Sequence, residues 1–130
     1  MSPVEIVKRS YDAFERKDLA GVLGDMHPEI VWEQAQGLPH GGIYHGPEEV
    51  RRNIFEPLDA EWWDEFSAAP DEFIAAGDQV VVIGRYRAVA KQTGKRLDVP
   101  FVHVWTLLDG KAIRFRQFLD TAGWVGALEI

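Results

Sequence analysis

The fold is decided by the stretch FVHVWTLLDGKAIRFRQFLD, residues 101–120, which has the pattern of two strands joined by a tight turn. Asp109-Gly110 is a strong signal for a two-residue hairpin loop, because such loops favour residues that tolerate a positive φ. A loop of this length predicts an antiparallel register in which His103 lies opposite Arg116. The same register gives the further pairs Phe101 with Phe118 and Val99 with Asp120.

A second hairpin is predicted just before the first. Thr93-Gly94 predicts another two-residue loop, which places Gly84 opposite His103. Directly paired residues share one face of a sheet, so the two hairpins define a common face. This face is expected to carry Val82, Gly84, Tyr86, Ala88, Val99, Phe101, His103, Trp105, Leu107, Arg114, Arg116, Phe118 and Asp120. Apolar and aromatic side chains with a few polar groups are typical of a pocket wall.

The opposite face of these strands is also apolar at its centre. It is expected to carry Val81, Ile83, Val102, Val104, Leu108, Ile113, Phe115 and Leu119, among others. An antiparallel sheet that leaves one face in water is normally polar on that face. We therefore expect helices to cover one face and a second subunit to cover the other, which predicts a homodimer through the outer sheet face.

Helix signals occupy the first half of the chain. The segment SPVE, residues 2–5, predicts a capped helix start, and apolar residues follow at helical spacing as far as Phe14. Asp18 can cap a second short helix, and a third is predicted from Pro47 to about Phe55. The other predictions are a strand over 30–34, an irregular GLPHGGIYHGP segment and a loop or short helix over 57–71. Helices followed by an antiparallel meander predict one α+β domain over residues 1–130, with helices on one face of a curved sheet.

Composition excludes several classes of protein. The chain has 130 residues, 46% of them hydrophobic, a net charge of −7 and no cysteine, which suits one domain with a real core. The lack of cysteine excludes a disulfide framework, a thiolate metal site and a cysteine nucleophile. The acidic balance argues against generic binding to nucleic acid or anionic membranes, and no stretch resembles a transmembrane helix or signal peptide. We expect a soluble, cytoplasmic protein.

His103 and Asp120 are the leading candidates for acid/base groups. An imidazole among aromatic rings can exchange a proton near neutral pH, although a buried histidine can also be purely structural. Asp120 can be a carboxyl group whose pKa is raised by an apolar wall, or it can cap the next turn or helix. The expected register separates the two by about 13 Å, at about 3.3 Å per residue, so they would flank a bound molecule rather than touch.

Other polar residues are weaker candidates for the functional site. Tyr86 can donate a hydrogen bond to a carbonyl or enolate oxygen, but its ring can also serve only as core. Arg116 can hold an anionic ligand or extend into solvent at the end of the sheet. His40 and His45 lie in the Gly-rich segment, and two histidines alone make a poor metal site, so we expect a solvated loop and no metal.

Three segments resemble one known family: VKRSYDAFERKDLAGVLGDMHPEIVWE, YHGPEEVRRNIF and FVHVWTLLDGKAIRFRQFLDT. Together they resemble the nuclear transport factor 2-like (NTF2-like) superfamily, and most closely its SnoaL-like branch of polyketide cyclases and ketosteroid isomerase-related proteins. The resemblance implies a cystatin-like α+β barrel, a cone-shaped antiparallel sheet wrapped on three N-terminal helices around an apolar pocket. It also implies a homodimer and a small apolar ligand. The superfamily holds enzymes of several kinds and many non-enzymes.

Carried over residue by residue, the resemblance gives a mixed result. Ketosteroid isomerases have a general base Asp where this chain has Gln34, while His103 matches their oxyanion-stabilising acid, and their tyrosine falls near Ser10 or Tyr11. The Arg/Asp/Asp set of limonene epoxide hydrolases is broken. SnoaL-like cyclases are matched better, by His103 and Asp120. The ligand-binding residues expected are Tyr11, Phe14, Trp32, Gln34, Phe55, Trp63, Phe101, Trp105, Arg116 and Phe118.

These observations lead to two functional hypotheses. The first is a cofactor-free enzyme that moves a proton beside a carbonyl group, in an isomerisation, aldol cyclisation or dehydration. Its substrate would be apolar and oxygenated, such as a polyketide, terpenoid or steroid, with His103, Asp120 and Tyr86 as catalytic residues. The second is a non-catalytic ligand-binding or dimerisation module of the same fold.

Overall fold

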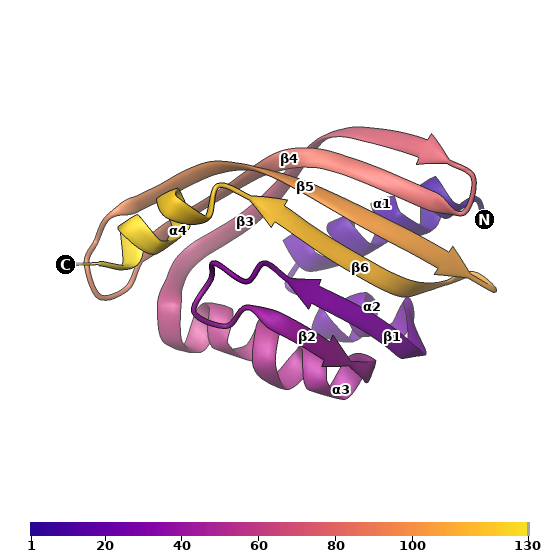
Figure 1. The fold of residues 1–130 in the computed structure, drawn as a ribbon, viewed down its shortest axis with the longest axis horizontal. Coiled ribbons are helices and arrows are strands. Elements are labelled where there is room, and N and C mark those ends of the chain that lie inside the picture. Colours follow the sequence, from indigo (N-terminus) through magenta and orange to yellow (C-terminus); the bar gives the residue numbers. More distant parts are fainter. Residues whose placement is uncertain (130) are drawn as a thin grey trace.

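The computed structural model describes residues 1–129 and contains one six-stranded sheet flanked by helices (Figure 1). The strands lie in the order β2-β1-β6-β5-β4-β3. Their bounds are β1 Met26–Gln34, β2 Gly42–His45, β3 Trp63–Ala76, β4 Gln79–Ala90, β5 Arg96–Leu108 and β6 Lys111–Leu119. The helices are α1 Pro3–Glu15, α2 Leu19–Gly24, α3 Gly46–Val50 and α4 Thr121–Leu128, with π-helical turns η1 Arg51–Phe55 and η2 Leu58–Trp62 after α3.

The hairpin of β5 and β6 turns at Asp109-Gly110, as predicted, but it contains a bulge. Leu107 pairs with Ala112, whereas Thr106 pairs with Arg114, so Ile113 is an extra residue in β6. A β-bulge of this kind shifts every later pair by one position.

The shift reverses the predicted faces of β6. His103 pairs with Gln117 rather than with Arg116. Phe115 and Gln117 are buried, whereas Phe118 is 52% exposed. The predicted inner positions for Arg114, Arg116 and Phe118 were therefore wrong, because a one-residue slip moves each side chain to the opposite face.

The hairpin of β4 and β5 differs from the predicted register, but the same residues still face inward. Residues 91–95 connect the strands, a longer connection than the predicted two-residue loop, and Gly84 pairs with Phe101 instead of His103. A shift of two residues preserves the face. The predicted inner residues of these strands are confirmed as buried: Val82, Gly84, Tyr86, Ala88, Val99, Phe101, His103, Trp105 and Leu107.

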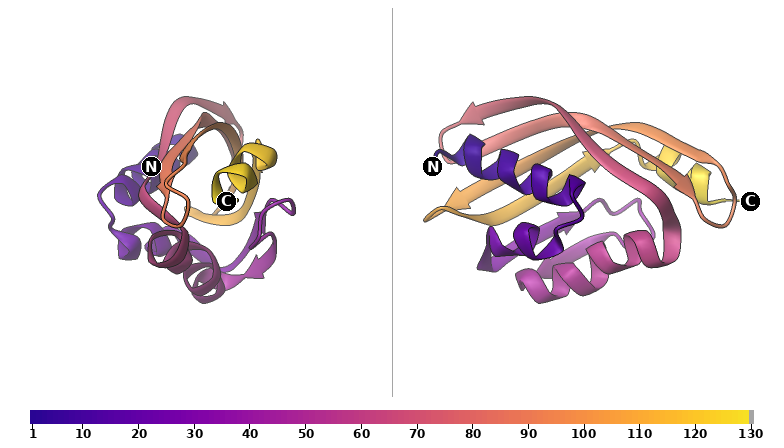
Figure 2. Two further views of the ribbon diagram at one scale, coloured as in Figure 1. Left: turned by 90° about the vertical axis from the view of Figure 1, so that its left-hand side faces the viewer. Right: turned by 180° about the vertical axis from the view of Figure 1, so that it is seen from behind.

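The sheet is strongly bent and curls around its long axis (Figure 2). It is mixed rather than purely antiparallel, because β1 pairs with β6 in parallel. β1 begins earlier than predicted, and β2 lies within the segment predicted to be irregular. β3 takes up residues 63–71, for which we predicted a loop or short helix; it is an edge strand, so much of it is exposed and lacks an apolar alternation.

The helix signals are largely confirmed. Ser2 and Glu5 form the capping box of α1, and Asp18 accepts a hydrogen bond from the Gly21 backbone N–H at the start of α2. The third predicted helix continues as π-helical turns from Arg51. Among the described residues, no helix is long and apolar enough to cross a membrane.

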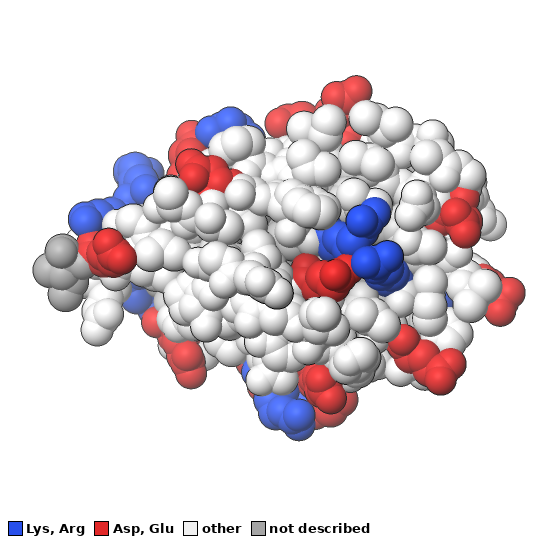
Figure 3. Space-filling view, in the orientation of Figure 1, with Lys and Arg blue, Asp and Glu red and all other residues white. Residues whose placement is uncertain are grey.

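The outer face of the sheet carries both ion pairs and exposed apolar side chains. In the orientation of Figure 1, one group of basic and acidic side chains lies near the middle of the visible surface, others lie along its rim, and the area between them is uncharged (Figure 3). Phe118 and Ile43 are exposed by 52% and 56% of their surface. Arg114 pairs with Glu33 across β6 and β1 at 2.7 Å.

Candidate functional site

A cavity lies between the inner face of the sheet and the surrounding helices. Its walls come from every helix except α3 and from every strand except the short β2, and its volume is about 70 Å³. It is lined by Ser10, Tyr11, Phe14, Val22, Trp32, Gln34, Ile54, Phe55, Leu58, Phe66, Ala68, Tyr86, His103, Trp105, Phe115, Gln117 and Trp124. Within the described part of the chain, no Asp, Glu, Lys or Arg lines it. The wall is therefore aromatic and uncharged, with a few polar groups.

The polar centre of the cavity consists of Tyr11, His103 and Tyr86. The Tyr11 hydroxyl lies 2.5 Å from His103 Nδ1, and the Tyr86 hydroxyl makes a hydrogen bond with His103 Nε2. Trp105 Nε1 donates to the Tyr11 hydroxyl at 3.0 Å, and Gln117 Nε2 donates to the Tyr86 hydroxyl at 2.9 Å. His103 is thus held at both ring nitrogens, so neither nitrogen is free for a further hydrogen bond.

Burial makes all three groups neutral at ordinary pH. It lowers the pKa of His103 to about 3, because a charged imidazolium would lose its hydration. It raises the pKa of the Tyr11 and Tyr86 hydroxyls for the same reason. Phe101 stacks on the His103 ring with centroids 4.0 Å apart, which fixes the plane of the imidazole.

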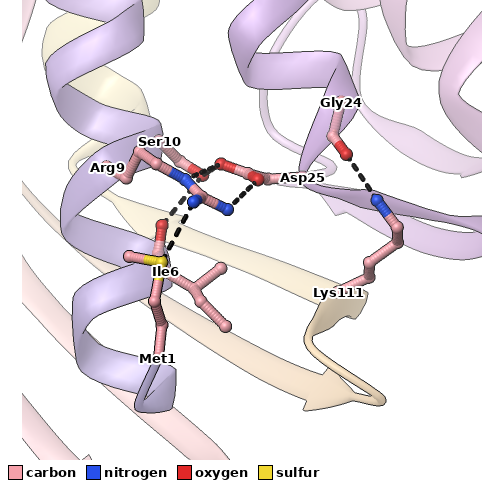
Figure 4. A network of polar contacts seen from close by, with 7 residues as sticks. All are labelled: Met1, Ile6, Arg9, Ser10, Gly24, Asp25 and Lys111. Carbon is pink, nitrogen blue, oxygen red and sulfur yellow. Dashed lines mark hydrogen bonds and ion pairs between the residues drawn. The ribbon is translucent and has the colours of Figure 1, made fainter.

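One ion pair and several hydrogen bonds fasten the helix turn that carries Tyr11. Asp25, at the end of α2, accepts a hydrogen bond from Ser10 and pairs with Arg9 at 2.5 Å, while Lys111 donates to the Gly24 carbonyl oxygen at 2.7 Å (Figure 4). Asp25 is only 8% exposed, and its own carbonyl oxygen accepts from the backbone of β6. These contacts fasten α1 to α2 and the sheet at the turn that carries Tyr11.

A second polar chain at the edge of the cavity contains a histidine that sequence reasoning placed in a solvated loop. Trp32 Nε1 donates to Gln34 Oε1 at 2.9 Å, and Gln34 Nε2 lies 2.8 Å from His40 Nε2. His40 packs edge-on against Trp62, and burial lowers its pKa to about 4. The prediction was therefore wrong for His40, whereas His45 is exposed. Among residues 1–129 there is no group of three or more His, Cys, Asp or Glu side chains that could hold a metal ion.

The structure gathers most of the predicted site residues in one place. Those that line the cavity are Tyr11, Phe14, Trp32, Gln34, Phe55, Tyr86, His103 and Trp105. Trp63 and Phe101 are fully buried but pack behind the wall, Trp63 against Trp124 and Phe101 against His103.

Three of the predicted residues lie elsewhere. Arg116 and Phe118 border a separate cavity on the outer side of β1 and β6, as the bulge requires. Asp120 is exposed and accepts a hydrogen bond from the Gly123 backbone N–H at 3.0 Å, which makes it the N-cap of α4. Of the two roles considered for Asp120, the geometry shows the cap.

Sequence reasoning missed several wall residues, among them Ser10, Phe66, Gln117 and Trp124. A bulge in β6 would have placed Gln117 on the inner face, but no residue type in this strand predicts that bulge. Trp124 is buried on α4, a helix that we did not predict beyond the possible cap at Asp120.

A second space lies next to the cavity. It has a volume of about 80 Å³ and shares Phe14, Val22, Phe55, Leu58 and Phe66 with the main cavity. The three phenylalanine rings between the two spaces are only partly buried.

Comparison with known proteins gives concordant results. A family model described as SnoaL-like domain matches residues 7–115. No curated protein matches the chain. A crystal structure of an NTF2-like protein from Burkholderia thailandensis E264 is similar at 35% identity and a TM-score of 0.95, over 100% of this chain and 99% of that chain.

Two further crystal structures are similar over the whole chain. An NTF2-like protein of unknown function from Burkholderia pseudomallei K96243 is 36% identical, with a TM-score of 0.91 and coverage of 100% of both chains. TerC, co-crystallized with polyporic acid, is 32% identical, with a TM-score of 0.87 over 99% of this chain and 100% of that chain.

Proposed function

The chain belongs to the SnoaL-like domain family, and from this premise we propose that it binds an apolar, oxygenated small molecule in its cavity and promotes proton transfer at a carbonyl group. The observation that carries the proposal is the Tyr11–His103–Tyr86 chain inside an otherwise uncharged, aromatic cavity. A tyrosine hydroxyl donates to the carbonyl oxygen, and His103 supports that hydroxyl from behind. Isomerisation, aldol cyclisation and dehydration all require a carbonyl activated in this way.

The ligand of TerC supports this class of substrate. Polyporic acid is a dihydroxybenzoquinone with two phenyl substituents, so it combines flat apolar rings with carbonyl oxygens. The same combination suits a wall built from Phe, Trp and Tyr rings around one polar centre. The cavity of about 70 Å³ is smaller than such a molecule needs, so we propose that binding rotates Phe14, Phe55 and Phe66 and joins the neighbouring space.

Binding without catalysis is the second candidate, and one observation favours it. Among the described residues no carboxylate lines the cavity, and Gln34 stands where ketosteroid isomerases have their general base. Gln34 also accepts from Trp32 and contacts His40, so it is fully engaged in the wall.

Two measurements separate these candidates. The first is a thermal-shift screen against polyporic acid, anthraquinones, steroids and terpenoid epoxides, in which a ligand at a hundredfold excess over its Kd stabilises the protein by about 2.7 kcal/mol. The second is NMR of an aromatic ketone, 2-tetralone, in D₂O, which follows exchange of the hydrogens beside the carbonyl group.

An enzyme is expected to accelerate this exchange, and the acceleration should be lost in His103→Gln but kept in the control His45→Gln, whose histidine is exposed. Thermal stabilisation without accelerated exchange would select the binding module. If no compound stabilises the protein, the proposed ligand class is wrong.

We also propose that the protein forms a homodimer through the outer face of the sheet. The exposed apolar side chains of Phe118 and Ile43 on this face support the proposal. Sedimentation analysis should show a dimer for the unaltered protein and a shift toward monomer for Phe118→Asp. A monomeric unaltered protein would refute the proposal.

A further inference from the structure

The hydrogen atoms around His103 can be counted from the contacts. Trp105 Nε1 can only donate, so the Tyr11 oxygen accepts one hydrogen bond from it. Gln117 Oε1 already accepts from the Ala35 backbone N–H at 3.0 Å, which orients the amide so that Nε2 donates to Tyr86. Each tyrosine oxygen therefore accepts one N–H before His103 is considered.

His103 and the two tyrosines carry three hydrogen atoms that can be donated, and the two hydrogen bonds between these groups use only two of them. Neutral imidazole carries one N–H, and the two tyrosines carry one O–H each, yet only two contacts join these groups. One nitrogen of His103 donates to a tyrosine oxygen, and the other accepts from the second tyrosine. The tyrosine that accepts from His103 keeps its own hydroxyl hydrogen, which needs another acceptor. Burial keeps His103 neutral, as the count requires.

No described side chain takes that hydrogen. Neither tyrosine hydroxyl makes a hydrogen bond beyond those to His103, Trp105 and Gln117. Among the described residues, Gln34 on the cavity wall accepts a hydrogen bond from Trp32 and none from either tyrosine. A buried hydroxyl without an acceptor is costly, so an acceptor atom inside the cavity would be favoured.

We propose that His103 acts as a tautomeric selector, which leaves a single hydroxyl hydrogen on either Tyr11 or Tyr86 for an acceptor oxygen of the bound molecule. This inference rests on the proposed function, in that the cavity takes a ligand. With the hydrogen on Nε2, the free hydroxyl belongs to Tyr86; with the hydrogen on Nδ1, it belongs to Tyr11. The site thus favours carbonyl, quinone or enolate oxygens over groups that only donate, and it can receive that oxygen at two positions.

The selector is tested without any ligand by ¹⁵N NMR of the His103 ring. In ligand-free Tyr11→Phe, the Tyr86 hydroxyl can satisfy its hydrogen only by donating to Nε2, so the ring hydrogen should reside on Nδ1. In ligand-free Tyr86→Phe, the Tyr11 hydroxyl should likewise donate to Nδ1, so the ring hydrogen should reside on Nε2. The same tautomer in both variants, or a protonated His103 in the unaltered protein at neutral pH, would overturn the inference. Thermal unfolding shows that each variant is folded.

Ligand affinity provides the second readout, measured with polyporic acid by calorimetry. Either tyrosine alone can present the free hydrogen, so each single variant should keep its affinity within about threefold, whereas the double variant should lose about tenfold or more. Tyr44→Phe is the matched control, because its hydroxyl donates to the His40 carbonyl oxygen outside the cavity. Additive losses from the two single variants would contradict the selector. If polyporic acid does not bind, the proposed ligand fails while the tautomer result stands on its own.

Discussion

Acid should destabilise this protein through His103, and the size of the effect follows from burial. The pKa of His103 is about 3 in the folded protein and about 6.5 when exposed on unfolding. Below pH 6.5 the His103 ring therefore binds a proton in the unfolded chain but not in the folded chain. The stability due to the neutral histidine is lost as the pH falls. Each pH unit costs about 1.4 kcal/mol, so between pH 7 and pH 5 the group should remove about 2 kcal/mol from the free energy of unfolding.

The assay is urea unfolding of the unaltered protein and of His103→Gln at pH 7 and pH 5. Carboxyl groups and His40 also titrate, but they are common to both proteins and cancel when the two pH dependences are compared. The unaltered protein should lose about 2 kcal/mol more than the variant over this interval. His45→Gln, which alters an exposed histidine, should keep the full pH dependence.

The comparison uses the change in the free energy of unfolding between pH 7 and pH 5, so it does not depend on how stable the variant is at either pH. Equal pH dependence in the unaltered protein and His103→Gln would show that His103 takes up a proton in the folded protein as readily as in the unfolded chain. At pH 5 both ring nitrogens would then donate to Tyr11 and Tyr86, so the hydrogen count around the cavity would fail in acid.

Three other substitutions test the packing and the division of roles. Gly84→Ala should lower the free energy of unfolding in urea by about 1–3 kcal/mol, because the added methyl group would press on the Ala69 carbonyl oxygen and lie 2.6 Å from Phe101; an unchanged urea midpoint would contradict this packing. Asp120→Ala should lower the free energy of unfolding by about 1 kcal/mol through loss of the α4 cap, and it should leave ligand affinity in calorimetry unchanged. A large loss of affinity would instead place the carboxyl group at the ligand. Ala68→Leu should fill the cavity, so that the thermal shift caused by a ligand disappears while the circular dichroism spectrum remains; a retained shift would mean that ligands bind elsewhere.

Much of the fold could be predicted because its signals are local. The capping box at Ser2 and Glu5 and the Asp109-Gly110 turn each depend on a few neighbouring residues, and both are present. The inner face of β5 also followed from alternation alone, which placed His103 in the cavity wall.

What failed depends on distant contacts. The bulge in β6 is favoured by the burial of Phe115 and Gln117 and by pairing with β1, neither of which is visible within the hairpin. Tyr11 and His103 are 92 positions apart, so no spacing rule could join them; only the resemblance placed a tyrosine near this position. Residues 63–71 of the edge strand β3 escaped prediction because the exposed residues among them are acidic and the segment lacks apolar alternation.

The extra residue in β6 also matters for how the chain reaches its native state. Before β1 joins the sheet, the isolated β5–β6 hairpin can pair without a bulge, and that regular register turns Arg114 and Arg116 toward the future core. Reaching the native register from there requires β6 to slip by one position relative to β5. Removing Ile113 would make the regular register identical to the native one, with Phe115 and Gln117 still inside. Ile113 does not line the cavity, yet its presence determines whether the regular register of this hairpin is also the native one.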